Sequence, residues 1–141
     1  MEKHDYETEI RNDLADWLRE RASYDNMTAD AFEEARERLE DEAWTADSVT
    51  GNGSGSYFFS AWKAEEAICH NLDLLAEALR EFGEEGADIL EKGAEACDVT
   101  IRCYLLGQVF SDAFEKVLDE LREKEEAASA ASAGAPAAAD A

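Results

Sequence analysis

The stretch IRCYLLGQVF, residues 101–110, decides the fold, because it is apolar on nearly every side of the helix that its spacing predicts. Arg102 and Gln108 interrupt it. A helix that is apolar all round is usually central and buried. The sequence therefore predicts a mostly α-helical domain built around a helix from about residue 98 to residue 124. The residues expected at its centre are Leu105, Leu106, Val109 and Phe110.

Further helices are predicted where apolar residues recur every three or four positions. They span about residues 3–22, 28–43 and 61–82, with a shorter one over 84–91. Thr28 is expected to cap the second of them. Together with the central helix, these segments predict a compact bundle of four to five helices.

The helical spacing stops between residues 44 and 60, where glycines lie among β-branched and aromatic residues. Asn52-Gly53 is a strong turn signal. The segment predicts one short Gly-rich β-hairpin or an ordered loop. Because a lone hairpin is marginally stable in water, it must pack on the helices, and Trp44, Tyr57 and Phe59 are the expected anchors.

The two ends of the chain differ in composition. Residues 127–141 are almost only Ala, with Ser, Gly, one Pro and one Asp. Such a segment has no large apolar group to bury, so it predicts a disordered tail. Residues 1–126 are then one acidic helical domain, which is long enough for a single core.

Charge is the most unusual property of the chain. It has 13 basic and 35 acidic residues, and therefore a net charge of −22. This charge repels nucleic acid and anionic membranes, and it favours basic protein partners. The alternative is that the acidity serves solubility alone.

The sequence predicts a cytoplasmic protein without a membrane segment. The N-terminal residues contain no apolar stretch typical of a signal peptide, and no segment has the roughly 20 apolar residues that span a bilayer. Cys69, Cys97 and Cys103 are odd in number and form no CxxC pair, so we expect reduced thiols.

No catalytic motif is found. The Gly-rich residues 51–55 precede a helix, as phosphate loops do, but no Walker lysine accompanies them. A structural turn, an interaction loop and a phosphate site remain open there. His4 and His70 stand outside HExxH and CxxC contexts, and no serine lies in a GxSxG elbow. We therefore expect no enzyme activity, no cofactor and no metal.

Carboxylates recur at helical spacing along the first two predicted helices and define a candidate partner-binding face. On the first helix they are Glu2, Asp5, Glu9, Asp13, Asp16 and Glu20; on the second they are Asp30, Glu33, Glu37, Glu40 and Asp41. The alternative is a solvated face that nearby arginines partly neutralise. The candidate contacts from the Gly-rich segment are Trp44, Thr45, Asp47, Thr50, Asn52 and Tyr57.

The motif WTADSVTGNGSGSY, residues 44–57, resembles the signature of an uncharacterised family of small acidic bacterial proteins found where phages and conjugative elements are common. Residues 71–75, 81–83 and 98–104 resemble its later blocks, so the resemblance covers about residues 44–107. It implies no catalytic residues. By analogy of size, charge and setting, the chain has the general look of anti-CRISPR and antirestriction proteins, some of which mimic DNA.

Two functions follow as expectations. The first is a binding inhibitor of a basic nucleic-acid-handling enzyme, such as a CRISPR effector or a restriction enzyme. The second is a non-enzymatic helical adaptor whose acidity serves only solubility. Binding by a charge mimic should weaken steeply with salt, whereas an apolar adaptor interface should not.

Overall fold

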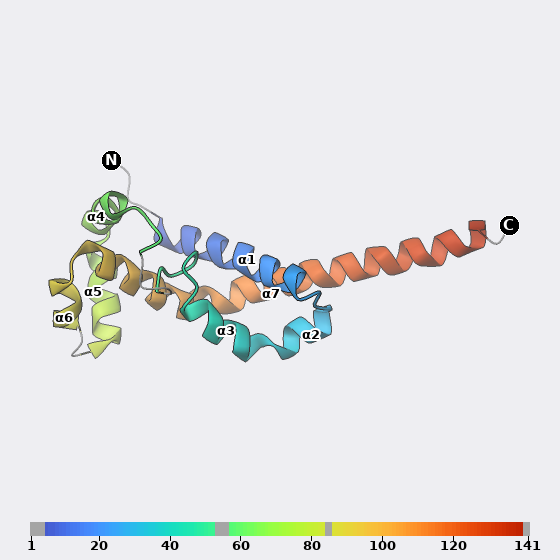
Figure 1. The fold of residues 1–141 in the computed structure, drawn as a ribbon, viewed down its shortest axis with the longest axis horizontal. Helices are drawn as coiled ribbons and strands as arrows, with labels where there is room; N and C mark the ends of the chain where they lie inside the picture. The colour runs from blue at the N-terminus through green and yellow to red at the C-terminus, as the bar shows by residue number, and fades with distance from the viewer. Residues whose placement is uncertain (1–4, 53–56, 84–85, 140–141) are drawn as a thin grey trace.

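The structure, a computed structural model, describes residues 5–52, 57–83 and 86–139, the side chains of 86–87 and 131–139 excepted. Within these residues the chain forms seven helices and no strand (Figure 1). A mostly α fold is therefore confirmed. The predicted bundle of four to five helices is not, because two of the predicted helices are each interrupted by a bend.

One long helix, α7 (Ala94–Ala139), is the spine of the molecule, and each of the other six helices packs against it (Figure 1). Its central residues are almost fully excluded from solvent, as the apolar sequence predicts: Leu105, Leu106, Val109 and Phe110 are 1–3% exposed. The prediction for the centre of the core is confirmed.

Helix α1 (Tyr6–Tyr24) lies along α7 and runs parallel to it. Tyr6 meets Asp98 near the start of both helices, and Arg19 meets Glu120 thirteen residues further along α1. Asp5 caps α1 by accepting a hydrogen bond from the backbone N–H of Thr8 at 3.0 Å. The contacts of Tyr6 with Asp98 and of Arg19 with Glu120 fix which side of α1 faces α7.

The predicted second helix is two helices, α2 (Ala29–Glu34) and α3 (Arg36–Trp44). Thr28 caps α2 as predicted, and its hydroxyl accepts from the Ala31 N–H at 3.1 Å. The bend falls at Ala35, where ψ is 4°. It lets Phe32 and Leu39 on either side of it both become fully buried.

The predicted third helix also divides, into α4 (Ala61–Cys69) and α5 (Leu72–Glu81). Asn71 causes the break: its Nδ2 donates to the Ala67 carbonyl at 2.9 Å, and its φ is −138°. Asparagine competes with helical hydrogen bonding in this way. The break leaves Leu72, the first residue of α5, 63% exposed.

The β-hairpin predicted for residues 44–60 is not confirmed. Residues 45–51 form consecutive turns, in which Val49 and Thr50 donate backbone hydrogen bonds to Ala46. No strand is present in the described residues on either side of the gap. Gly53 of the predicted Asn52-Gly53 turn lies outside the described residues. The predicted anchors hold in part, since Tyr57 and Phe59 are half-buried and Trp44 packs edge-on against Phe82 with ring centroids 6.3 Å apart.

Helix α6 (Gly86–Glu91) precedes α7, which begins at Ala94 rather than near residue 98 and ends beyond residue 124. The extra length at the C-terminus projects past the rest of the molecule (Figure 1). It is rich in alanine, the best helix former. The described side chains of 122–130 are all exposed, and the domain boundary at 126 stays a prediction.

In the part of the chain that the structure describes, no helix combines the length and the apolar character needed to cross a membrane.

We predict that Phe110→Ala lowers the free energy of unfolding by about 3–5 kcal/mol, because it opens a cavity in the centre of the core. Phe110 is 2% exposed and its ring lies 5.7 Å from that of Phe114. Chemical denaturation followed by circular dichroism measures the effect. Tyr24→Ala, at a side chain that is 83% exposed, is the control and should leave the midpoint nearly unchanged. Equal midpoints for the two variants would contradict the placement.

Candidate functional site

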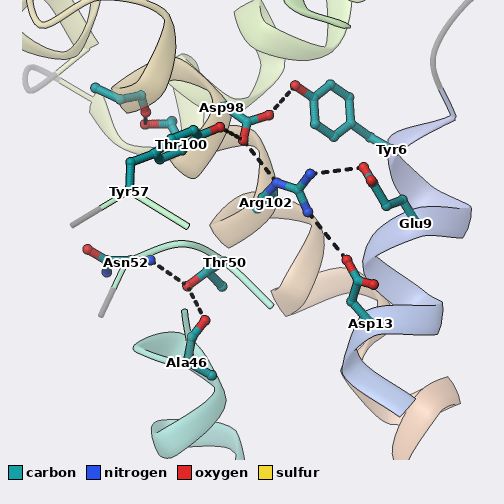
Figure 2. Close-up of polar contacts among 11 residues, drawn as sticks. Tyr6, Glu9, Asp13, Ala46, Thr50, Asn52, Tyr57, Asp98, Thr100 and Arg102 are labelled. Atoms are coloured by element: carbon teal, nitrogen blue, oxygen red, sulfur yellow. Dashed lines mark hydrogen bonds and ion pairs between the residues drawn. The ribbon is translucent and has the colours of Figure 1, made fainter. Parts of the chain in front are cut away.

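A buried arginine lies at the junction of α1 and α7 (Figure 2). Arg102 is 4% exposed, and its guanidinium meets three carboxylates. Nε donates to Asp98 Oδ2 at 3.0 Å, Nη2 donates to Glu9 Oε2 at 2.9 Å, and Nη1 lies 3.6 Å from Asp13 Oδ2. Residues 98 and 102 are one turn apart on α7, and residues 9 and 13 are one turn apart on α1, so each helix supplies two members at the (i, i+4) spacing.

Two tyrosines complete the coordination of Asp98, which is 2% exposed. The Tyr6 hydroxyl donates to Oδ1 and the Tyr57 hydroxyl donates to Oδ2. With the Nε of Arg102, the carboxylate thus accepts from three donors. We call these six residues, Tyr6, Glu9, Asp13, Tyr57, Asp98 and Arg102, the Arg102 cluster. It joins α1, α7 and the segment that leads into α4.

The environment of the Arg102 cluster shifts the pKa of several members. Burial disfavours the charged guanidinium, but Asp98 and Glu9 outweigh that effect and raise the pKa of Arg102. Burial, reinforced by Glu9, raises the pKa of Asp13. Burial and the carboxylate of Asp98 raise the pKa of both Tyr6 and Tyr57. The tyrosines therefore stay protonated and donate hydrogen bonds, which suits holding elements together rather than transferring protons near neutral pH.

Phe59 covers the open side of the arginine. The guanidinium carbon of Arg102 lies 3.7 Å from the centroid of the Phe59 ring, and 5.7 Å from that of Tyr6. These are cation–π contacts at a desolvated site, where they are worth about 2 kcal/mol or more. Tyr57, which donates to Asp98, and Phe59, which covers Arg102, are therefore fixed by the two members of one buried ion pair.

The loop of residues 45–52 is ordered by hydrogen bonds within the loop. The Thr50 hydroxyl donates to the Trp44 carbonyl at 2.9 Å. It accepts from the Asn52 N–H at 3.1 Å (Figure 2). Gly51 has φ +78°, and an added Cβ would come within 3.4 Å of Phe59 and Val99. The loop thus packs directly onto the ring that covers Arg102.

A surface pocket of about 540 Å³ opens above the Arg102 cluster, and we call it the α4 pocket. Its wall on the α4 side carries Trp62, Lys63 and Glu66, with His70 at the end of that helix. Its floor is formed by side chains already described: Glu9, Tyr57, Phe59, Asp98 and Arg102. Trp62 is 69% exposed, and Tyr57 and Phe59 add two half-buried rings to the lining. The pocket therefore combines aromatic rings with carboxylates.

The predicted acidic face on the first helix does not form one row toward solvent. Glu2 lies outside the described residues. Asp5 is the N-cap, and Glu9 and Asp13 turn toward Arg102. Asp16 is exposed but pairs with Arg19 at 2.8 Å, and Glu20 is exposed. The predicted row is divided because the buried guanidinium of Arg102 on α7 attracts the carboxylates of Glu9 and Asp13.

The acidic residues predicted on the second helix are more accessible. The exposed members are Asp30, Glu33, Glu37, Glu40 and Asp41, of which Glu33 pairs with Arg122.

The predicted loop contacts include both buried and exposed residues. Thr50 is fully buried, and Tyr57 and Asp47 are half-buried, whereas the exposed ones are Trp44, Thr45 and Asn52.

The sequence analysis did not assign Arg102, Asp98 and Trp62 to a site, and it expected Phe59 only as an anchor of the Gly-rich segment. A signal for the first two was present, since Asp98 and Arg102 stand one helical turn apart in a stretch, residues 97–110, that is otherwise mostly apolar. A buried charge is almost always paired. Three consecutive aromatic residues, Tyr57, Phe58 and Phe59, likewise precede α4, and Trp62 lies in its first turn.

Metal and thiol chemistry can be surveyed over the same residues. In residues 5–52, 57–83 and 86–130, no group of three or more histidine, cysteine or carboxylate side chains is placed to hold a metal ion. Cys69 is exposed, and Cys97 and Cys103 are buried as free thiols. Burial raises the pKa of the Cys103 thiol to about 11, which keeps it unreactive.

Comparison of the chain with protein-family models, with curated proteins and with solved structures finds no match. The family resemblance of residues 44–107 therefore stays a prediction.

We predict that Arg102→Met lowers the free energy of unfolding by about 3–5 kcal/mol at neutral pH, because it leaves the cluster carboxylates without their cation. Denaturant titration measures the loss. Arg38→Met is the matched control: that side chain is 52% exposed and pairs with Glu42, so its loss should cost less than about 1 kcal/mol. If the two variants were equally stable, the cluster would not be the support described above.

We predict that the protein loses stability as pH rises above about 10, because Tyr6 and Tyr57 ionise in the unfolded chain before they ionise in the folded one. A raised folded pKa means that the tyrosines contribute fully below pH 10 and progressively less above it. Tyr57→Phe should flatten this decline, measured as unfolding free energy against pH. Tyr24→Phe, at an exposed side chain, should retain the slope of the natural protein. Parallel slopes for both variants would refute the assignment.

Proposed function

We propose that this protein is a non-enzymatic inhibitor that uses its acidic surface to bind a basic, nucleic-acid-handling bacterial protein and block it. The observation that carries the proposal is the distribution of charge. The chain has 35 acidic residues against 13 basic ones, and the arginines are largely engaged within the fold. Those that pair with carboxylates are Arg11, Arg19, Arg21, Arg36, Arg38, Arg102 and Arg122.

Several of these pairs link separate helices. Arg19 of α1 binds Glu120 of α7 through two hydrogen bonds, of 2.7 and 2.8 Å, and Arg36 of α3 reaches Glu115 of α7. The charge of these arginines is balanced by carboxylates of the same chain. The surplus carboxylates therefore dominate the surface that a partner meets.

One outward face of α3 supports the proposal most directly. Glu37, Glu40 and Asp41 are all exposed and stand at the three- and four-residue spacings that share a helix face. Among the described residues, none of the three lies within 4.0 Å of a basic group. At about 1.5 Å rise per residue, the carboxylates repeat every ~4.5–6 Å, similar in spacing and sign to DNA phosphates.

A second acidic feature lies where the start of α1 meets α5. A hollow of about 430 Å³ is lined by Asp5, Glu7, Asp73 and Glu77. No basic residue is among its described lining residues. Such a concentration of one charge raises the encounter rate with a basic protein at low salt.

CRISPR effectors and restriction enzymes are the partners proposed, because their DNA channels present the lysines and arginines that a phosphate-like surface matches. The alternative is an adaptor whose acidity serves only solubility. Salt dependence separates the two, since a charge-driven complex weakens steeply with salt and an apolar interface does not.

We predict that neutralising Asp30, Glu37, Glu40 and Asp41 to Asn or Gln weakens partner binding about ten-fold or more at low salt and flattens its salt dependence. The matched control neutralises four exposed carboxylates at the other end of the molecule, Glu65, Asp88, Glu91 and Glu95. Both variants change the net charge of −22 by four units. A surface-specific interaction should be weakened much more by the first set than by the second.

The measurement is binding to, and inhibition of DNA cleavage by, a panel of CRISPR effectors and restriction enzymes at two salt concentrations. Tight binding with inhibition of at least one enzyme is the expected result. The proposal fails if no enzyme is bound or slowed at low salt, or if the two variants lose affinity equally.

A further inference from the structure

The α4 pocket is lined by groups that the structural role of the Arg102 cluster does not use. Trp62 and Glu66 lie one turn apart on α4 and both line the pocket, yet neither belongs to the cluster. Trp62 is 69% exposed, and it shares the pocket lining with the charged residues Lys63 and Glu66. Exposed aromatic side chains beside a concave surface are typical of a contact site for a partner.

The charge in and under the pocket favours a cation. Arg102 is already matched by Asp98, Glu9 and Asp13, which leaves that group with an excess of negative charge. Glu66 adds a further carboxylate to the wall, and Lys63 adds one cation. The pocket lining thus holds three carboxylates and the two cations Arg102 and Lys63, with the carboxylate of Asp13 also paired to Arg102, within a protein whose net charge is −22. A phosphate or carboxylate ligand would meet repulsion here, whereas a basic side chain would be attracted.

The aromatic lining favours a guanidinium. The floor of the pocket already holds one guanidinium against an aromatic ring, with Arg102 only 3.7 Å from the centroid of Phe59. Tryptophan offers the most favourable ring face for such a contact, and Trp62 is the ring that remains open to solvent. Arginine is also less strongly hydrated than lysine, so it enters a half-enclosed site more readily.

We propose that the α4 pocket receives a single arginine side chain of the protein partner, with Trp62 against the guanidinium plane and Glu66 as its ion-pair acceptor. This inference rests on the proposed function, because it takes the partner to be basic. It adds what a diffuse charged surface lacks: one shaped contact that distinguishes a particular basic protein from any polycation.

The test needs no partner. N-acetyl-arginine amide is titrated into the full chain, and the Trp62 indole N–H signal is followed by NMR, assigned with Trp62→Phe. Saturable binding with a dissociation constant of roughly 1–10 mM is expected. N-acetyl-citrulline amide, a neutral molecule of nearly the same shape, should leave the signal unmoved over the same range. N-acetyl-glutamate amide should also fail to bind.

Glu66→Gln should raise the dissociation constant about three-fold or more, since it removes the acceptor carboxylate and keeps the reporter ring. Glu65→Gln is the matched control: it removes the same charge one residue away on α4, outside the pocket lining, and should leave the constant unchanged. Equal shifts with arginine and citrulline amides, saturation by the glutamate amide, or equal effects of the two variants would each overturn the proposal.

The experiments distinguish failure of the proposed inhibitor function from failure of the proposed arginine site. Arginine amide binding in the pocket, together with no bound enzyme in the panel, would overturn the proposed function and support the pocket. Salt-sensitive enzyme binding through the α2 and α3 carboxylates, together with no arginine amide binding, would overturn the pocket and leave the proposed function standing.

Discussion

The buried ion pair between Asp98 and Arg102 is the interaction on which the rest of the structure depends. Two charges removed from water destabilise a fold unless every remaining donor and acceptor is satisfied. Asp98 meets this demand with two tyrosine hydroxyls in addition to Arg102. Arg102 meets it in part: Nη2 donates to Glu9, whereas Nη1 is buried without a hydrogen bond and lies 3.6 Å from Asp13. Satisfying one pair therefore fixes the rotation of α1 about its axis and ties the segment before α4 to α7. An apolar pair of the same volume would hold the helices together without specifying their register.

The same pair also determines the shape of the surface above it. Phe59 is drawn over the guanidinium and Tyr57 is held by Asp98, so the chain enters α4 from a defined position. Ser60 then caps α4, and Trp62 follows within its first turn. The exposed ring is thus carried on a short helix with a rigid approach. A preorganised aromatic side chain loses little entropy on binding, which is the property expected of an anchor residue.

The sequence predicts the central part of α7 correctly, but it predicts neither the breaks within the second and third predicted helices nor the buried charges, for a physical reason. Apolar residues recur with a period that local chemistry sets, so residues 101–110 could be placed at the centre from the sequence alone. The break at Asn71 depends on whether its side chain bonds to its own helix, and the carboxylates of Glu9 and Asp13 turn inward because a charge on another helix attracts them. Each depends on a tertiary contact that periodicity does not contain. The sequence pattern therefore predicts one acidic surface on α1, whereas the fold turns some of its carboxylates toward the interior and leaves others exposed to solvent.

That division gives the acidity of the chain a physical consequence. The carboxylates that pair with arginines stabilise contacts between helices, whereas the surplus at the surface repels itself and opposes compaction. Because salt screens this self-repulsion, added salt should stabilise the free folded protein, whereas it should weaken a charge-driven complex. A basic partner bound to the folded state relieves the same repulsion, and linkage requires that it stabilise the fold as it binds. The surface that opposes folding in the free protein is thus the surface from which a basic partner gains the most.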